Sequence, residues 1–282
     1  MKLPSGVLNF SGPTLVMAIV NCNEDSFYAP SRALLDKAVE MALAAEEDGA
    51  AIIDFGAESS RPGSSYISCE EEQERLIPVI SAFRKKSSLP VSVDTRKALV
   101  ARSALDAGAD IINDISGLVD DPDMAALCAE RGAAIVLMHK KGVPLTMQET
   151  PRYENLVAEL QSWFEAAANR ALAAGISPEK IILDPGIGFG KSLNDNLEIL
   201  RRLAEICGNE YPILVGLSRK SFIGEIVDRR PAHQSERQSD RLAGTLAANG
   251  AAIFSGANII RVHDVKEHVD LAKMLFALGK RD

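Results

Sequence analysis

The sequence predicts a (β/α)8 barrel, and two observations carry that prediction. First, eight apolar, β-branched runs recur along the 282-residue chain, with amphipathic helical patterns between them. Second, nearly all of these runs end on a polar or ionisable residue. The carboxyl ends of the strands form the active-site face of such a barrel, so this arrangement is typical of an enzyme.

An open, doubly wound sheet alternates strands and helices in the same way, but it gathers its ligand at one switch point. The runs and their polar residues are, in chain order, MAIVN with Asn21, IIDFGAES with Glu58, VSVDT with Asp94, IINDI with Asn113, IVLMH with His139, IILDP with Asp184, ILVGLSRK with Lys220 and IIRVH with His263. Because polar residues accompany nearly every strand, we favour the barrel. Such a barrel needs about 250 residues, so we expect a single domain over residues 1–282.

The individual elements follow from this pattern. Gly6, Gly12 and Pro13 punctuate residues 3–13, which predicts a short β-hairpin ahead of the barrel. We expect strands at about 14–21, 51–56, 90–94, 110–115, 134–139, 181–184, 212–217 and 259–263. We expect helices at about 33–48, 69–87, 97–108, 121–131, 155–174, 194–207, 235–255 and 265–278. Residues 225–240 are charged, which predicts a surface loop between the last two strands.

Composition narrows the choice of partners and compartment. The net charge of −8 argues against a nucleic-acid or anionic-membrane surface, although a local cationic pocket remains compatible with it. The N-terminus has no apolar targeting segment, and no apolar run approaches membrane-spanning length. Scattered cysteines without metal-ligand spacing are typical of reduced thiols in the cytoplasm; they are Cys22, Cys69, Cys128 and Cys207.

Acceptor-rich side chains on several strands suggest the kind of ligand. Asp94, Asn113 and Asp184 lie within or at the ends of apolar strands and must find hydrogen-bond donors. A fused 2-amino-4-oxo pyrimidine offers such donors, and its carbonyl and ring nitrogen match an ammonium such as that of Lys220. The alternative is structural: Arg96 as the partner of Asp94, or a nest of backbone N–H groups around Asp184.

A second group of residues suits an anion. Arg261 and His263 stand two residues apart on the last strand and so share a face, as a phosphate or pyrophosphate site requires. Arg61 lies in a loop rich in hydroxyls and glycine. The alternative for Arg261 is a salt bridge to a neighbouring carboxylate such as Asp264. Asn21 is a candidate Mg²⁺ ligand, although from the residues alone an Asx-turn that closes the strand is the better explanation.

Long segments in the same order resemble the dihydropteroate synthase family of pterin-binding barrels. They run from about Met17 to Leu278 and include IVNCNEDSF, IIDFGAESSRPGS, VSVDTRKALVARSALDAGADIINDISG, IVLMHKKGVPLTMQ, IILDPGIGFGKSLNDNLEIL, LVGLSRKSFIG and IIRVHDV. The resemblance implies a cytoplasmic, Mg²⁺-dependent transferase, a homodimer, that joins 6-hydroxymethyl-7,8-dihydropterin pyrophosphate to p-aminobenzoate. Pyrophosphate is released, and sulfonamides are the expected inhibitors.

The resemblance also assigns roles to particular residues. It implies that the pterin is held by Asp94, Asn113, Asp184 and Lys220, with Met138 and Phe189 lining the pocket and Arg261 stacking over it. It implies that pyrophosphate and Mg²⁺ are held by Asn21, Ser60, Arg61, Arg261 and His263, with Asn21 as the metal ligand. The p-aminobenzoate side matches Pro62, Phe189, Lys220 and Ser221. The groups expected to act in the reaction are Asn21, Arg61, Lys220, Arg261 and His263.

The first loop departs from the family pattern. Where N-V-T-P-D-S-F-S-D-G-G is usual, the chain reads N-C-N-E-D-S-F-Y-A-P-S from Asn21, so Glu24 and Ala29 replace a proline and an acid. These changes leave an alternative open, a pterin-binding paralogue with weak or no synthase activity. A pterin-dependent methyl transferase is a third possibility, and it requires a corrinoid partner.

Overall fold

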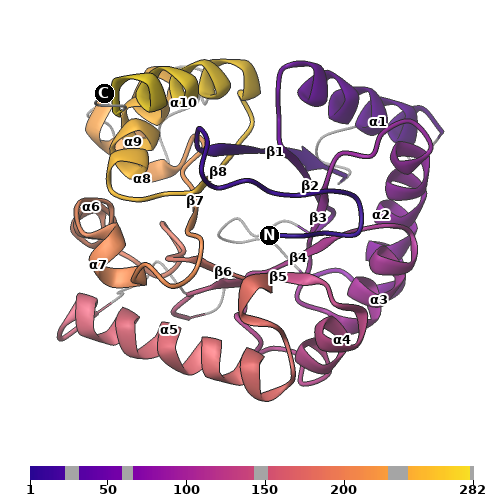
Figure 1. The fold of residues 1–282 in the computed structure, drawn as a ribbon, viewed down its shortest axis with the longest axis horizontal. Coiled ribbons are helices and arrows are strands. Elements are labelled where there is room, and N and C mark those ends of the chain that lie inside the picture. The colour runs from indigo at the N-terminus through magenta and orange to yellow at the C-terminus, as the bar shows by residue number, and fades with distance from the viewer. Residues whose placement is uncertain (23–31, 59–65, 143–151, 228–240, 280–282) are drawn as a thin grey trace.

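Eight parallel strands form the barrel that the sequence predicts, in the order β6-β5-β4-β3-β2-β1-β8-β7. The computed structural model describes residues 1–22, 32–58, 66–142, 152–227 and 241–279. A parallel bridge between Leu183 and Ile213 joins β6 to β7 and closes the ring. The helices surround the strands, as Figure 1 shows in a view down the barrel. The prediction of a (β/α)8 fold is therefore confirmed.

The strands lie within two residues of their expected positions. They are β1 Leu15–Asn21, β2 Ile52–Gly56, β3 Val91–Asp94, β4 Ile111–Asp114, β5 Ala134–Met138, β6 Ile181–Asp184, β7 Leu214–Gly216 and β8 Ile259–Val262. The helices are α1 Arg32–Glu47, α2 Cys69–Arg84, α3 Ala98–Asp106, α4 Met124–Arg131, α5 Leu156–Ala173, α6 Leu193–Arg201, α7 Leu203–Cys207, α8 Ser221–Val227, α9 Leu242–Phe254 and α10 Val265–Gly279.

Two helical predictions need correction. The helix expected at 194–207 is two helices, because Arg202 leaves helical geometry with φ −120° and ψ 28°. The helix expected at 235–255 is α9, which begins at Leu242, and the sequence pattern missed the short α8 after β7. Most of the predicted loop at 225–240 lies outside the described residues.

Helix boundaries have local causes. The hydroxyl of Ser68 accepts a hydrogen bond from the backbone N–H of Glu71 at the start of α2, and Ser192 and Asp195 form a reciprocal capping box at the start of α6. Gly108 follows α3 with φ +107°, a conformation that an L side chain rarely adopts. It turns the chain directly into β4. Among the described helices, none combines the length and hydrophobicity that crossing a bilayer requires.

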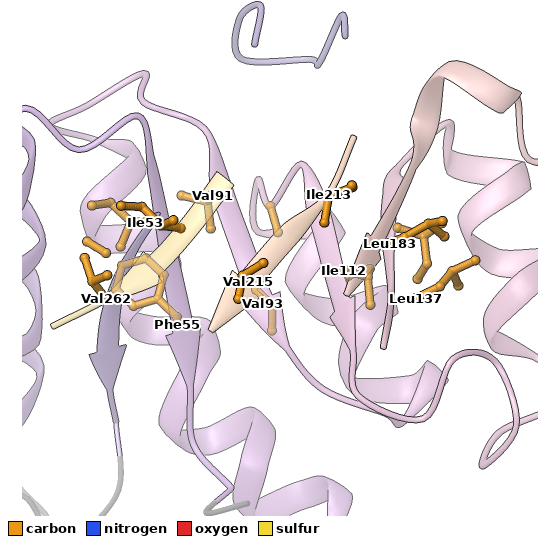
Figure 2. Packing of buried hydrophobic residues seen from close by; sticks show 14 of the residues in the cluster. Ile53, Phe55, Val91, Val93, Ile112, Leu137, Leu183, Ile213, Val215 and Val262 are labelled. Atoms are coloured by element: carbon orange, nitrogen blue, oxygen red, sulfur yellow. The ribbon is translucent and has the colours of Figure 1, made fainter. Parts of the chain in front are cut away.

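Because successive side chains of a strand point to opposite faces of the sheet, the barrel has two hydrophobic cores. Side chains that face outward, towards the helices, form the larger cluster; on the strands they include Ile53, Phe55, Val91, Val93, Ile112, Leu137, Leu183, Ile213, Val215 and Val262 (Figure 2). Side chains that face inward form a smaller cluster inside the barrel: Met17, Ile52, Ile111, Ala134, Val136, Ile182, Leu214 and Ile259. The next inward positions towards the carboxyl ends are mostly polar, which places the chemistry at that end of the barrel.

The N-terminal segment closes the opposite end. An antiparallel bridge between Lys2 and Val7 confirms the predicted hairpin, and Leu3 and Leu8 complete the inner apolar cluster. Figure 1 shows this segment crossing the end of the barrel. The buried Asp110 anchors it, because its carboxylate accepts hydrogen bonds from the hydroxyl of Ser5 at 2.8 Å and from the guanidinium of Arg84. The amino end of the barrel is thus covered by this segment.

Candidate functional site

Polar residues from neighbouring strands meet at one level inside the barrel. Asn21 pairs in register with Gly56, Gly56 with Asp94, and Asp94 with Asn113. Asp184 lies across the barrel, in register with Met138 on β5. Alternation along the strands explains this layer. Asn21, Gly56, Asn113 and Asp184 each follow an inward apolar residue by an even number of steps, and Asp94 pairs in register with two of them. Of the residues that the sequence singled out for a ring-shaped, donor-rich ligand, Asp94 and Asn113 are therefore neighbours, and Asp184 lies at the same end of the barrel on β6.

Arg261 lies between two carboxylates in this layer. Its Nε donates to Asp54 Oδ2 at 2.5 Å, and its Nη2 donates to Asp94 Oδ2 at 2.8 Å. Both structural alternatives from the sequence are therefore wrong about the partners. Arg96 donates to Glu58 instead of Asp94, and Asp264 accepts from Arg219 instead of Arg261. The cross-barrel distances decide these pairs, because neighbours in sequence diverge at the strand ends.

Burial destabilises the charged forms of the two carboxyl groups at this end of the barrel, Asp94 and Asp184. Burial raises the pKa of Asp94, and the nearby Asp54 adds to the rise, whereas Arg261 opposes it. Burial also raises the pKa of Asp184, although its Oδ1 accepts a 2.7 Å hydrogen bond from the backbone N–H of Gly186. That hydrogen bond is the backbone contact expected around Asp184. Both carboxylates gain from N–H donors of a ligand, which would replace the water they have lost.

Lys220 supplies the opposite charge. Burial lowers the pKa of Lys220 to about 8, with Arg261 adding to the fall and Asp184 opposing it. Its Nζ donates to the carbonyl of Ile187 and lies 4.4 Å from the centre of the Phe189 ring. The cation, the aromatic ring and the Asp184 carboxylate therefore converge from β7 and β6. This combination suits a flat, polar ring with both donors and acceptors.

Glycines let the loop after β6 approach the end of β5. Gly186 has φ +64°, and a Cβ there would overlap the carbonyl oxygen of His139. Gly190 has φ +65°, and its Cβ would overlap the carbonyl oxygen of Lys141. Only glycine satisfies both the conformation and the close approach. This contact sets the position of Phe189 between them.

His139 is a structural residue, held by Lys191 and Trp163. Its Nδ1 lies 2.9 Å from Nζ of the buried Lys191, and its ring packs edge-on against Trp163 with centroids 5.1 Å apart. Lys191 also donates to the carbonyls of His139 at 3.2 Å and Phe189 at 3.1 Å. Burial and the Lys191 charge lower the pKa of His139 to about 3, so the imidazole is neutral and accepts from the ammonium. This pair ties the two loops together beneath the site.

The segment that carries Lys220 is held from two sides. Arg219 has φ +56°, which is unusual for a residue with a side chain, and its guanidinium binds the Asp264 carboxylate after β8. Arg241 donates to the carbonyl of Arg219 at 3.0 Å. Ser218 Oγ lies 2.8 Å from Nδ1 of the exposed His263. These contacts couple the ends of β7 and β8 and start α8 at Ser221.

Three predicted residues lie outside the described part of the chain: Ser60, Arg61 and Pro62. Asn21 ends β1 with a partly exposed side chain that makes no hydrogen bond within the described residues. No group of three or more His, Cys, Asp or Glu side chains there could hold a metal ion. A single amide oxygen still fits Mg²⁺, which is commonly held by one or two protein oxygens together with substrate phosphate and water. The donor set therefore suits a metal that arrives with its anion.

Comparison with known proteins assigns the family. A model of the pterin binding enzymes matches residues 17–263. Curated dihydropteroate synthases are 43% identical in Synechocystis, over 99% of this chain and 95% of that protein, and 44% identical in Escherichia coli, over 93% and 90%. The chain belongs to the dihydropteroate synthases.

Solved structures of the family agree. A dihydropteroate synthase from Clostridium difficile, solved in the presence of pteroic acid, superposes with a TM-score of 0.89 at 37% identity and covers 98% of this chain and all of its own. The Yersinia pestis dihydropteroate synthase, in complex with a sulfonamide drug, gives 0.88 at 39%, over 99% and 98%. The family and enzyme class inferred from the sequence are thus confirmed, and these comparisons favour a synthase over the two rival readings.

Sequence reasoning missed one residue of the site in this synthase. Asp54 is fully buried in the middle of β2 and binds Arg261. In the run IIDFGAES, however, the sequence pattern had indicated only Glu58 as a candidate site residue. Glu58 lies beyond the strand and accepts from Lys97 at 2.8 Å and Arg96 at 3.2 Å, so it is a structural ion pair. The sequence did contain a signal for Asp54, namely the alternation of inward and outward positions along a strand. Asp54 stands two residues after the inward Ile52, and a carboxylate at an inward position needs a cation.

Proposed function

We propose that this protein joins 6-hydroxymethyl-7,8-dihydropterin pyrophosphate to p-aminobenzoate, giving 7,8-dihydropteroate and pyrophosphate. One observation carries the proposal: Asp94, Asn113, Asp184 and Lys220 converge inside the carboxyl end of the barrel. A solved structure of the Xanthomonas albilineans family member, 36% identical to this chain, is a complex with 7,8-dihydropteroate. The proposal transfers that ligand chemistry to this site.

The pterin is recognised by complementary hydrogen bonds. Its amino and ring N–H groups donate to the carboxylates of Asp94 and Asp184, and Asn113 contributes its amide. The ammonium of Lys220 donates to the ring carbonyl and ring nitrogen. Met138 is buried beside Asp184 and forms an apolar wall, while Phe189 lies under the Lys220 ammonium. Buried polar groups paired in this way discriminate strongly against rings that lack the matching donors.

The pyrophosphate is bound by cations at the rim. Arg261 and His263 alternate on β8 and face the same side, and Arg61 and Ser60 join them by family resemblance. We propose Asn21 as the protein ligand of Mg²⁺. The ion supplies charge neutralisation to the leaving pyrophosphate.

Departure of pyrophosphate begins the reaction. The bond between the pterin methylene and the pyrophosphate oxygen breaks, and its electron pair leaves with the pyrophosphate. The electron-rich pterin stabilises the cation left at the methylene, and the carboxylates of Asp94 and Asp184 favour that charge. The amine of p-aminobenzoate, held beside Phe189 and Ser221, then forms the C–N bond and loses a proton. Sulfonamides that resemble the arylamine compete for the same place.

The protein is also proposed to act as a cytoplasmic homodimer. Four free cysteines are consistent with a reducing compartment. Large apolar side chains are exposed on α9 and α10, which pack together through Gly250 and Leu271: Phe254 at 70%, Met274 at 59% and Leu278 at 62% exposure. A second copy is the expected cover for such a patch. Light scattering on the protein should give twice the mass of one chain, and Phe254→Glu should reduce it to the monomer mass.

The decisive experiment measures release of pyrophosphate from dihydropterin pyrophosphate in the presence of Mg²⁺, with and without p-aminobenzoate. Release that depends on the arylamine, and that chelation of the metal abolishes, supports the synthase. Binding without arylamine-dependent release would support the pterin-binding paralogue instead. In that case Ala29→Asp should restore turnover if the first loop is responsible. Turnover that requires a corrinoid would indicate a methyl transferase.

A further inference from the structure

Asp54 occupies a deep polar position on the inner wall of the barrel. It lies on β2 between the inward Ile52 and Gly56, and its side chain is completely buried. By comparison, the side chain of Asp94 is 13% exposed and that of Arg261 is 21% exposed. A ligand that enters from the mouth of the barrel reaches Arg261 and Asp94 before it reaches Asp54. Asp54 therefore contacts the ligand site only through other side chains.

The contacts of Asp54 are asymmetric. Its Oδ2 accepts from Arg261 Nε at 2.5 Å and lies 3.4 Å from Asn113 Nδ2. Its Oδ1 is buried and has no hydrogen-bond partner among the described residues. A buried carboxylate with one oxygen unsatisfied lowers stability, and the guanidinium is the only cation in direct contact with it there. The side chain is thus poorly explained as a stabilising feature of the fold.

In this structure the two groups that should receive substrate are bound to each other. Arg261 Nη2 donates to Asp94 Oδ2 at 2.8 Å, so a pterin that uses Asp94 as an acceptor competes with the guanidinium. Once the ligand takes Asp94, Arg261 would be free to swing away on its long side chain. The Nε contact to Asp54 does not meet the ligand and can persist.

We propose that Asp54 is a positioning residue for Arg261. It retains the guanidinium at Nε when the pterin displaces Nη2 from Asp94, and it thereby fixes the plane of the guanidinium over the pocket with its Nη atoms towards the pyrophosphate. The proposal rests on the proposed function for the identity of the ligand. The contact with Asp54 holds Arg261 in place while the pterin is bound. Neither Asp94 nor Asp184 can do this, since both are expected to bind the pterin.

The test is a double-mutant cycle between Asp54→Asn and Arg261→Ala. Asparagine keeps the shape and removes the charge. We expect Asp54→Asn to weaken binding of dihydropterin pyrophosphate about tenfold and to lower kcat, while KM for p-aminobenzoate changes less than twofold. In the Arg261→Ala background the same substitution should change binding less than twofold. An equal effect in both backgrounds would overturn the proposal.

A matched control lies on the next strand. Ser92 pairs in register with Asp54, is fully buried, and has a hydroxyl without a partner among the described residues. Ser92→Ala removes a buried polar group from the same layer without touching Arg261, so we expect unchanged binding. Equal losses in Ser92→Ala and Asp54→Asn would show that the layer responds to any change, and would also overturn the proposal.

Stability separates positioning from folding. Asp54→Asn removes one of the two carboxylates that pair with Arg261, so some fall in Tm is expected, and binding is measured well below the Tm of each variant. If that variant does not fold, Asp54→Glu keeps the charge and shifts the guanidinium by one methylene, and the same cycle is measured. If neither folds while Ser92→Ala does, Asp54 is a structural requirement and the proposal fails. Binding is titrated without arylamine, so it reports on Asp54 even if the wild-type protein releases no pyrophosphate, the outcome that would refute the proposed function alone.

Discussion

Arg261 Nη2 donates a hydrogen bond to Asp94 Oδ2 across the mouth of the barrel, at 2.8 Å. The cation expected to meet pyrophosphate and the carboxylate expected to meet the pterin are therefore paired in the absence of substrate. Each compensates the charge of the other in a site with little water. Substrate must replace this ion pair with its own contacts to both side chains. The binding affinity therefore depends on how strong those contacts are relative to the ion pair.

Replacing Lys220 should remove the principal donor to the pterin. We expect Lys220→Ala to weaken pterin binding about tenfold to a hundredfold, the usual contribution of a hydrogen bond to a charged group, and to leave Asp184 buried without its cation. Calorimetric titration with dihydropterin pyrophosphate measures the change. Lys140→Ala is a suitable control, because Lys140 binds Asp120 in the neighbouring loop. Tight binding by the Lys220 variant would contradict the pocket assignment.

Binding should also depend on pH through the same lysine. The pKa of Lys220 is lowered to about 8, so the side chain is an ammonium below pH 8 and increasingly a neutral amine above it. The ammonium is the form that donates to the ring, so affinity should fall as pH rises through 8, approaching about tenfold per pH unit. Lys220→Arg stays charged over this range. The difference between the two titration curves removes any contribution from ionisation of the ligand.

His263 should act on the pyrophosphate and not on the pterin ring. It is exposed at the end of β8, with Nδ1 close to Ser218 Oγ. We expect His263→Ala to raise KM for dihydropterin pyrophosphate several-fold, and a pterin that lacks pyrophosphate should bind as before. Steady-state kinetics and a parallel titration with 6-hydroxymethylpterin measure the two effects. Equal losses for both ligands would place His263 at the ring instead.

Gly186 should be irreplaceable for a reason that goes beyond its backbone conformation. Gly186 and Gly132 have similar positive φ values, +64° and +60°, but a Cβ at Gly132 would meet no neighbouring atom, whereas a Cβ at Gly186 would overlap the carbonyl oxygen of His139. Gly132→Ala should cost about 1 kcal/mol of conformational strain, whereas Gly186→Ala should cost several-fold more and reduce turnover by displacing Phe189. Denaturant unfolding gives both free energies. Equal costs would mean that the loop relaxes freely.

The buried His139 should make the fold sensitive to acid. Its pKa in the folded protein is lowered from 6.5 to about 3, so between these values the unfolded chain binds a proton that the folded protein does not. Stability should therefore fall as pH decreases below 6.5, by up to about 1.4 kcal/mol per pH unit from this group. Burial lowers the pKa of Lys191 to about 7, so the comparison is made below pH 6, where Lys191 is protonated in both states. Unfolding of His139→Gln from pH 6 to 4 should show the shallower slope.

Sequence periodicity was sufficient for the barrel and for most of the polar inner layer. Strands with a period of two residues must alternate between inner and outer faces, so a polar residue an even number of steps from an inward apolar one faces the interior. Arg261 and His263 were paired in this way, whereas Asn113 and Asp184 stood out as polar residues within or at the end of apolar runs. Asp54 was missed because it lies in the middle of its strand, whereas the polar residue at the end of the run is Glu58. Glu58 lies past the last strand residue and binds Lys97.

By itself, the sequence determined the order of the strands, the level at which polar residues replace apolar ones, and the family. Only the tertiary structure decided which charges meet. Arg261 pairs with Asp54 and Asp94, which are 207 and 167 residues away in the chain, and not with the adjacent Asp264. The physical reason is that ion pairing depends on distance across the closed barrel and on the burial of each group, and neither quantity is encoded in separation along the chain.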